Sequence, residues 1–325
     1  MTTPRADRMP KEAAMYPSPQ NHPAYLWWQG RQVAWDEATV HVTSLGWTGI
    51  SAVFEGIRAY WNAEQQRLHV FAIDAHLKRL AQSMKLVRMT SPYSSDEIKQ
   101  AAIKLLRDNE LQEDSYIFPL AYFPSGIPGY LAVYEQPGEV MMTTRPRESS
   151  MLTGRALHCN ISSWRRISDN TMPPRAKMTT NYQNSRFVST EASINGYDTA
   201  IILNDQGKVA ESPYACVFIV RDGVAYTPPV TAGVLESITR DIVMQILQEE
   251  LGVPCRERDV DRTEMYIADE AFLCGTFAEI TPIASVDRYT LGSGSAGPIT
   301  SRLEQLFHDV VRGRDDRYSE LRTIV

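Results

Sequence analysis

The order of strand and helix signals restricts the fold of this chain more than any other feature. Short apolar runs joined by glycine-containing turns predict β-hairpins in the second half, and another hairpin is predicted around Gly30 near the start. The second-half hairpins pair 200–203 with 208–211 and 217–220 with 224–226. Because hairpin strands are antiparallel neighbours, this order disfavours a sheet of repeated strand–helix–strand units. We therefore expect an α+β fold.

Amphipathic helices separate these strand regions. Asp74 is a suitable N-cap for a helix that runs to about Val87, and Ser95 is a suitable N-cap for the next helix. Three further helices are predicted over 183–194, 237–251 and 301–311. Additional strands are predicted over 116–123, 140–144, 157–161 and 271–274.

A chain of 325 residues is longer than one typical domain and suggests two. The polar, turn-rich segment that begins at Arg145 is the candidate boundary. We predict a flexible arm over residues 1–22, a small N-terminal domain over 23–145, an interdomain loop over 146–154 and a larger C-terminal domain over 155–325.

Composition excludes several classes of function. A formal net charge of −6 gives no electrostatic case for binding nucleic acid or an anionic membrane. No apolar run approaches the ~20 residues that a membrane span needs, and no secretion signal is recognisable. The four cysteines form no C-x-x-C motif, so neither a disulfide framework nor a metal site is predicted. A cytoplasmic location is expected.

The most suggestive candidate for chemistry is Lys177, which lies near the middle of the chain among small, apolar and amide residues. Two prolines stiffen its approach. A lysine amine that is shielded from water can act as a nucleophile. The alternative is an ordinary surface lysine, and Arg175 two residues earlier favours that interpretation.

Other polar residues are ambiguous one by one. Glu211 at a strand end could point into a cleft or into solvent, and Arg79 could be a surface charge. Ile238-Thr239 could bind a phosphate at a helix start or simply cap that helix, and Gly275-Thr276 forms a second such corner. Together they supply an amine, an acid and phosphate donors, which pyridoxal 5'-phosphate (PLP) requires.

Longer motifs make the pattern specific. In chain order they are Val53-Phe54-Glu55-Gly56-Ile57-Arg58-Ala59-Tyr60, His76-Leu77-Lys78-Arg79-Leu80, Lys177 with Asn181-Tyr182, Glu211, Gly233 with Ile238-Thr239-Arg240, Ala268-Asp269-Glu270, and Gly275-Thr276-Phe277-Ala278-Glu279-Ile280-Thr281-Pro282. In this order the chain resembles the class IV (fold type IV) PLP aminotransferases, most closely the branched-chain amino acid aminotransferases. The resemblance implies a D-amino acid aminotransferase-like fold, with a small N-terminal α/β domain and a larger, mixed β-barrel-like C-terminal domain.

The resemblance also implies roles for individual residues. Lys177 would bind PLP covalently and carry the substrate's proton, Tyr182 would contact the ring oxygen, and Glu211 would pair with the ring nitrogen. The phosphate would be bound by Arg79, Ile238, Thr239 and Thr276. The amino group would pass from an amino donor to a 2-oxo acid in a ping-pong cycle through pyridoxamine 5'-phosphate.

Departures from the family pattern fall around the substrate. The substrate residues implied by resemblance are Gly49, Phe54, Arg58, Tyr116, Phe118 and the backbone of Thr276 and Phe277. Phe118 stands where branched-chain enzymes usually have arginine, and Gly49 where they have a large aromatic residue. We therefore expect a more apolar pocket with room for bulkier groups, and glutamate as a poor donor. Branched-chain or other hydrophobic L-amino acids are the expected donors.

Three alternatives stay open. An (R)-selective amine:pyruvate transaminase needs no arginine for a second carboxylate. A lyase of the aminodeoxychorismate-lyase type shares the cofactor and the lysine, and a non-enzymatic descendant would bind no cofactor. The resemblance further implies a homodimer or larger homo-oligomer, with the loop Pro124–Glu135 as a candidate to reach the partner's active site.

Overall fold

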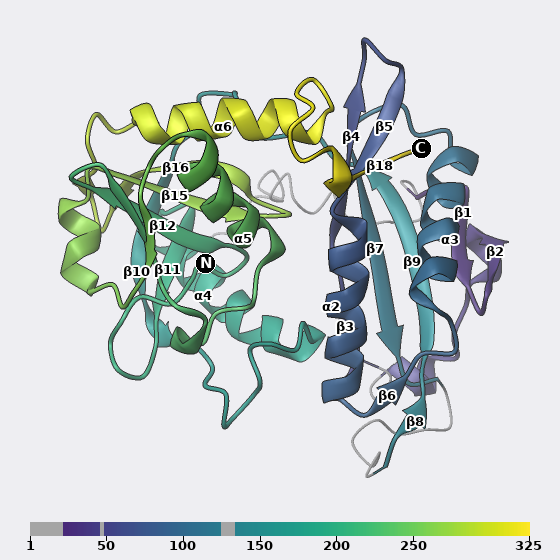
Figure 1. The fold of residues 1–325 in the computed structure, drawn as a ribbon. Helices are drawn as coiled ribbons and strands as arrows, with labels where there is room; N and C mark the ends of the chain where they lie inside the picture. Colours follow the sequence, from purple (N-terminus) through teal and green to yellow (C-terminus); the bar gives the residue numbers. More distant parts are fainter. Residues whose placement is uncertain (1–21, 46–48, 125–133) are drawn as a thin grey trace, which may run out of the picture.

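The structure, a computed structural model, describes residues 22–45, 49–124 and 134–325. Most of the predicted arm over 1–22 and of the loop Pro124–Glu135 therefore lies outside the described residues. Two eight-stranded sheets organise the chain, one built mainly from the first half of the sequence and the other from the second half. Figure 1 shows these two halves side by side, each with its own helices.

The first sheet has the order β18-β5-β4-β7-β9-β1-β2, and β3 pairs with β7 at one side. All of these pairs are antiparallel. The strands are β1 (Tyr25–Trp28), β2 (Arg31–Ala34), β3 (Val53–Phe54), β4 (Ile57–Asn62), β5 (Arg67–Phe71), β7 (Ser115–Tyr122), β9 (Glu139–Pro146) and β18 (Arg322–Ile324). A separate two-stranded sheet joins β6 (Met89–Thr90) to β8 (Gln136–Pro137).

The last strand departs from the predicted division of the chain. Arg322 in β18 lies opposite Phe71 in β5, so the C-terminal end belongs to the sheet of the first half. The final strand within the predicted domain over 155–325 therefore pairs with the sheet of the first half. Pairing between segments about 250 residues apart leaves no local signal in the sequence, which explains the difference.

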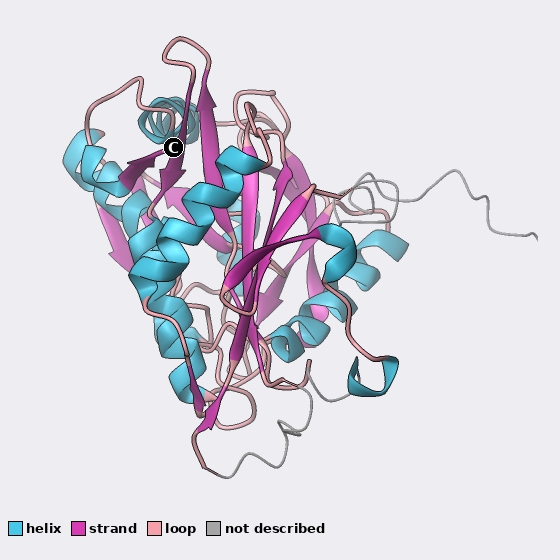
Figure 2. Cartoon of the chain, turned by 90° about the vertical axis from the view of Figure 1, so that its right-hand side faces the viewer, coloured by secondary structure: helices cyan, strands magenta, loops and turns pink. Residues whose placement is uncertain are grey.

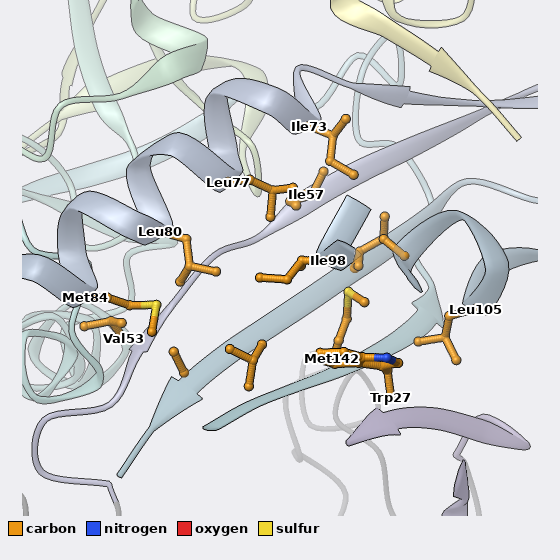
Figure 3. Close-up of a cluster of buried hydrophobic side chains, with 14 of the residues drawn as sticks. Trp27, Val53, Ile57, Ile73, Leu77, Leu80, Met84, Ile98, Leu105 and Met142 are labelled. Atoms are coloured by element: carbon orange, nitrogen blue, oxygen red, sulfur yellow. The ribbon is translucent and has the colours of Figure 1, made fainter. Parts of the chain in front are cut away.

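Two helices, α2 (Ile73–Leu86) and α3 (Ser95–Asp108), cover one face of the first sheet. Figure 2 shows the helices packed against the sheet. Figure 3 shows part of the core between them, in which Leu77, Leu80 and Ile98 are buried with strand residues. The helix starts differ from prediction by one or two residues. The N-cap of α2 is Ala72 in a left-handed conformation, and the N-cap of α3 is Ser94, which forms a capping box with Glu97.

The second sheet has the order β11-β10-β16-β15-β12-β13-β14, with β17 paired to β16. Its strands are β10 (Leu157–Arg165), β11 (Thr199–Leu203), β12 (Cys216–Arg221), β13 (Val224–Thr227), β14 (Cys255–Glu257), β15 (Glu270–Gly275), β16 (Glu279–Val286) and β17 (Tyr289–Thr290). The predicted hairpin over 217–226 is confirmed as β12 and β13. Parallel pairs, such as β10 with β11, make this sheet mixed.

The other predicted hairpin is present as an irregular antiparallel pairing, in which a bridging segment over 208–211 lies beside β11. Residues 208–211 form no regular strand, although the amide of Ala210 donates to the carbonyl of Ile202 in β11 at 2.9 Å. On the other side, the amide of Val209 donates to the carbonyl of Val260 at 2.9 Å. The segment thus connects β11 to the chain that follows β14, and it gives the sheet a barrel-like closure that ends at Glu211.

Three longer helices accompany the second sheet: α4 (Tyr182–Ile194), α5 (Ile238–Gln245) and α6 (Pro298–Val311). The helix predicted over 237–251 is confirmed, with Ser237 as its N-cap and a π-helical continuation over Ile246–Glu250. Helix α6 lies across the top of the second half in Figure 1, and its Phe307 ring meets Phe71 of the first half at 5.7 Å between centroids. In the described part of the chain, no helix is long and apolar enough to span a membrane.

Candidate active site

Lys177 lies where the two halves of the molecule meet. Its amide donates to Ser83 Oγ on α2 at 3.1 Å, and its carbonyl accepts from the amide of Phe54 at 3.0 Å. The neighbouring Met178 bridges to Val53. These contacts fix the backbone of the lysine from both sides, while the side chain amine donates to Tyr182 Oη at 2.6 Å. Lys177 is thus held against the tyrosine that sequence analysis paired with it.

The lysine opens into a cavity of about 890 Å³. Most of the predicted site residues line this cavity, although they come from both halves of the chain. They are Gly49, Phe54, Arg79, Tyr116, Phe118, Lys177, Tyr182, Glu211, Thr276 and Phe277. The fold therefore brings together residues that lie more than 200 positions apart in the sequence.

Glu211 forms a buried ion pair at the end of the bridging segment. Its Oε1 lies 2.7 Å from Arg166 Nη2, and its Oε2 accepts from the amide of Leu235 at 3.2 Å. Both side chains are more than nine-tenths buried. Burial raises the pKa of Glu211, and the Arg166 guanidinium opposes that rise. The pair keeps a largely buried carboxylate in the cavity wall.

Arg79 is held by a second buried network. Its Nε and Nη2 donate to the two oxygens of Glu55 at 2.7 and 2.8 Å, and His76 Nδ1 lies 2.8 Å from the same carboxylate. Arg79 Nη1 donates to the carbonyl of Glu236 at 2.6 Å, just before α5. Burial would raise the pKa of Glu55, but Arg79 and His76 outweigh it and lower the pKa to about 2. The guanidinium is therefore fixed beside the start of α5.

The start of α5 can bind an anion. Ser237 lines the cavity and caps the helix by accepting from the amide of Arg240 at 3.2 Å. The amides of Ile238 and Thr239, in the first turn, have no acceptor within the helix. Neither residue is part of the cavity lining, unlike Ser237. With Arg79 beside it, this helix start offers backbone donors and a positive charge to a phosphate.

Aromatic rings form the wall beside the lysine. Phe54 packs against Tyr182 at 4.9 Å and against Phe118 at 5.3 Å between centroids. The backbone at Gly56 approaches Tyr116 closely, because a Cβ there would lie 1.7 Å from Tyr116 Oη. At Gly49, by contrast, a Cβ would meet no described atom within 4 Å. Among the described residues, this position leaves room for a side chain.

Arg58 is placed differently from the prediction. It does not belong to the described residues that line the cavity, and only 1% of it is exposed. Its Nη2 lies 3.2 Å from Glu279 Oε1, and Glu279 also accepts from the amide of Ser150 at 2.7 Å. A buried guanidinium requires such a carboxylate partner. Arg58 therefore joins β4 to β16 and lies outside the described lining of the cavity.

Several residues of the site were not predicted from the sequence. Arg166, Ser237 and Arg145 line the cavity, and Glu55 orients Arg79. Glu55 stood inside a recognised motif, but nothing local assigned it a partner. Arg166 directly follows β10, so a cationic residue at the end of a buried strand was the available signal.

A PLP molecule fits the donors found here. An amine, a phenol, a buried carboxylate and an arginine beside a helix start all face one cavity or adjoin it. These groups match the aldehyde, the ring oxygen, the ring nitrogen and the phosphate of PLP, respectively.

Comparisons with known proteins agree with this arrangement. Residues 52–286 match the amino-transferase class IV family. A probable branched-chain-amino-acid aminotransferase of Aquifex aeolicus is 37% identical over 301 residues, which cover 93% of this chain and 96% of that protein. The branched-chain amino acid aminotransferase of Thermobaculum terrenum in its PLP form is 48% identical with a TM-score of 0.90, over 94% of this chain and 99% of that chain.

A third relative comes from an archaeon. The branched-chain aminotransferase of the thermophilic Thermoproteus uzoniensis, solved with norvaline, is 39% identical with a TM-score of 0.85. The alignment covers 93% of this chain and 99% of that one. With family match, sequence identity and structural similarity all extending over most of its length, the chain belongs to the class IV aminotransferases, the fold type IV PLP enzymes that resemble branched-chain aminotransferases.

Proposed function

We propose that this aminotransferase transfers the amino group of a branched-chain or other hydrophobic L-amino acid to a 2-oxo acid, in a PLP-dependent ping-pong cycle. One observation supports the proposal most. Lys177 and Glu211 face the same cavity, and the wall between β7 and the lysine is formed by Phe54 and Phe118. An apolar wall next to a nucleophilic amine suits a donor with an apolar side chain. The relatives named above are branched-chain enzymes, which supports the same donors.

Each cofactor contact is assigned to a residue. Lys177 would hold PLP covalently, Tyr182 its ring oxygen and Glu211 its ring nitrogen. Arg79 and the start of α5, with Ile238, Thr239 and Thr276, would hold the phosphate. When bound, PLP delocalises negative charge from the α-carbon of the donor.

Lys177 is also the base of the reaction in this proposal. Its amine would take the α-proton of the donor and return a proton when the amino group is delivered to the 2-oxo acid. The hydrogen bond to Tyr182 Oη, 2.6 Å long, orients the amine. The Arg166 guanidinium favours the ionised form of Glu211, which a protonated ring nitrogen requires. The backbone amides of Thr276 and Phe277 would bind the α-carboxylate.

A panel of donors tests the proposal. The holoenzyme is mixed with L-leucine, L-valine and L-glutamate, and the visible absorbance of the bound cofactor is followed by stopped flow. We expect L-leucine to discharge that absorbance and pyruvate or 2-oxoglutarate to restore it. A holoenzyme that reacts with no hydrophobic L-amino acid would overturn the proposal.

An (R)-amine transaminase is the second candidate, and two features of the cavity favour it. Phe118 presents a ring in place of the usual arginine, and Gly49 leaves space next to the cavity. An amine has no carboxylate, so it loses nothing at such a wall. (R)-1-phenylethylamine, added to the donor panel with its (S)-enantiomer as control, decides whether this activity accompanies amino acid transfer. A lyase would release pyruvate without an amino acceptor, and the relatives named above are aminotransferases.

We also propose a homodimer. Val40 lines the cavity yet is 52% exposed, so a part of the cavity rim is apolar and uncovered in the single chain. Light scattering of the purified protein measures its mass and would exclude a dimer if it gave the mass of one chain. The cytoplasmic location predicted from composition stays a prediction.

A further inference from the structure

The turn between β15 and β16 forms one wall of the cavity. Gly275, Thr276 and Phe277 line the cavity, and the pairing of Gly275 with Glu279 closes the turn. In the proposed function, the backbone amides of Thr276 and Phe277 bind the α-carboxylate of the substrate. Because backbone donors cannot rotate as side chains do, the conformation of the turn decides how well they meet that carboxylate.

Glu279 ends the turn in an unfavourable backbone conformation. Its φ is +53°, in the left-handed region that residues with a Cβ rarely adopt. Glycine tolerates this conformation, whereas a glutamate in it must be held by its surroundings. Glu279 is only 1% exposed, so its carboxylate contacts protein groups and not solvent. The contacts of that carboxylate therefore bear on the shape of the turn.

Donors from two parts of the chain converge on the Glu279 carboxylate. Its Oε1 accepts from Arg58 Nη2 at 3.2 Å and from Ser149 Oγ at 2.9 Å. Its Oε2 accepts from the amide of Ser150 at 2.7 Å and from Ser150 Oγ at 3.1 Å. Arg58 belongs to β4 in the first half, whereas the two serines belong to the loop between β9 and β10. Both oxygens are thus engaged, and the carboxylate is fixed from two directions.

Arg58 supplies the positive charge that this arrangement needs. A buried carboxylate without a charged partner is costly, and the guanidinium beside Glu279 offsets that cost. Arg58 Nη1 also donates to the carbonyl of Glu148 at 3.4 Å, in the same loop as the two serines. Arg58, which the resemblance implies as a substrate residue, thus contacts Glu279, and Glu279 ends the turn.

From this geometry we propose that Glu279 is a positioning residue, whose side chain holds the amides of Thr276 and Phe277 in the direction that an α-carboxylate requires. Arg58 and the two serines of the loop act through Glu279. The inference rests on the proposed function, in which those two amides bind the α-carboxylate. It gives a role in substrate binding to an ion pair that lies outside the described lining of the cavity.

A purely structural role for Glu279 makes a different prediction, and Glu304 provides the comparison. Glu304 is another buried carboxylate that holds the same loop, because it accepts from the amide of Leu152 at 2.8 Å. It belongs to α6 and not to the turn. Removing either carboxylate should loosen the loop and lower the Tm. Only the removal of Glu279 should weaken the binding of a carboxylate in the cavity.

Calorimetry of the holoenzyme with two unreactive probes tests the proposal. 4-Methylvaleric acid carries a carboxylate, and 4-methylvaleramide has nearly the same shape without the charge. In Glu279→Gln we expect the dissociation constant of the acid to rise roughly tenfold, as for a misaligned hydrogen bond to a charged group. The constant of the amide should change by less than about threefold. In the control Glu304→Gln, both constants should stay within about threefold of those of the unmodified protein.

A second variant separates the anchor from the backbone conformation. Glu279→Gly removes the carboxylate but allows a positive φ without steric cost, so the turn can still form. We expect the same loss of affinity for the acid as in Glu279→Gln. The value of kcat/KM for L-leucine should fall in parallel, whereas the visible absorbance of the bound cofactor should match that of the unmodified holoenzyme.

Unchanged affinity for the acid in both Glu279 variants would overturn the proposal, because the direction of the amides would then not depend on this side chain. Equal losses for the acid and the amide would also overturn it, since they indicate general damage to the cavity. If the unmodified holoenzyme does not react with L-leucine, the proposed function itself fails, whatever Glu279 does.

Discussion

The two sides of the cavity treat charge in opposite ways. On the cofactor side two pairs of opposite charges are buried: Glu211 pairs with Arg166, and Arg79 pairs with Glu55. On the substrate side, β7 and β9 present rings, aliphatic groups and one arginine along a single sheet face. Charges that are fixed in pairs keep one geometry, which the chemistry of a cofactor requires. In the wall of side chains, by contrast, a single substitution can change which substrates are accepted.

Removing Lys177 should have the largest effect on activity of all the changes considered, because this residue belongs to the chemistry of the cofactor side. Lys177→Ala deletes both the covalent anchor and the base, so we expect the transamination rate to fall roughly 10²- to 10⁴-fold. The visible absorbance of the bound cofactor should change with it. Lys78→Ala, at an exposed position on α2, is the control and should keep full activity. Near-normal turnover in Lys177→Ala would refute the assignment of the lysine.

The buried pair on the cofactor side is tested by removing either partner. Glu211→Gln and Arg166→Gln each leave one buried charge uncompensated, at a cost of about 3–5 kcal/mol in the free energy of unfolding. Because both changes affect one contact, the double variant should lose clearly less than the sum of the two. Urea unfolding of the three variants measures these values. Additive losses would mean that the two side chains stabilise the protein independently.

Glu55 gives a smaller effect with a defined dependence on pH. Its pKa falls from 4.5 to about 2 on folding, so its ionised form stabilises the folded protein by roughly 3 kcal/mol at neutral pH. That stabilisation is complete above pH 4.5 and is lost as the pH falls towards 2. The difference in unfolding free energy between Glu55→Gln and the unmodified protein should therefore shrink from pH 7 to pH 3. A constant difference would show that Glu55 acts through packing.

The pKa shift of Glu211 has the opposite sign to that of Glu55, so the two carboxylates of the cofactor side affect stability differently. Its pKa is raised by burial, so its ionisation opposes folding as the pH rises above its ordinary range. Glu55 is thus a carboxylate that stabilises its surroundings, whereas Glu211 is ionised at some expense of stability. A carboxylate that is held in its ionised form although this lowers stability suits a role in function. The proposed contact of Glu211 with the ring nitrogen requires that form.

Local patterns in the sequence predicted most helices and the hairpin of β12 and β13. Apolar spacing within α2 and α3, and the glycine turn at Gly223, depend only on residues close together in the chain. Pairing between distant segments has no such signal. The C-terminal strand β18 and the contact of the bridging segment with Val260 were missed for that reason.

The site shows the same limit. Lys177, Glu211 and Arg79 could be selected because they stand in recognisable motifs, whereas Arg166 is defined only by its distance from Glu211. Arg58 was misplaced because a motif does not reveal that Glu279, 221 positions away, takes up its charge. Arg145 was missed because the register of β7 and β9 is needed to see that it neighbours Phe118.

The substrate side should respond to a single change at Gly49 with the smallest effect of this series. The carbonyl of Gly49 accepts a hydrogen bond from Thr179 Oγ1 at 2.8 Å, so its backbone is fixed close to the lysine segment. A side chain there would enter free space, because a Cβ at Gly49 meets no described atom within 4 Å. Gly49→Phe should therefore lower kcat/KM for L-phenylalanine by about tenfold and change that for L-valine much less.

The comparison of two donors in one variant separates the two sides of the cavity. Cofactor binding is common to both donors, so an effect on that side would reduce both rates equally. An effect on the substrate wall depends on the size of the side chain, and Gly49→Ala should give an intermediate loss for L-phenylalanine. Stopped-flow rates with both donors provide the measurement. Parallel losses in Gly49→Phe would show that position 49 supports the cofactor, and the wall would then begin further from the lysine than we infer.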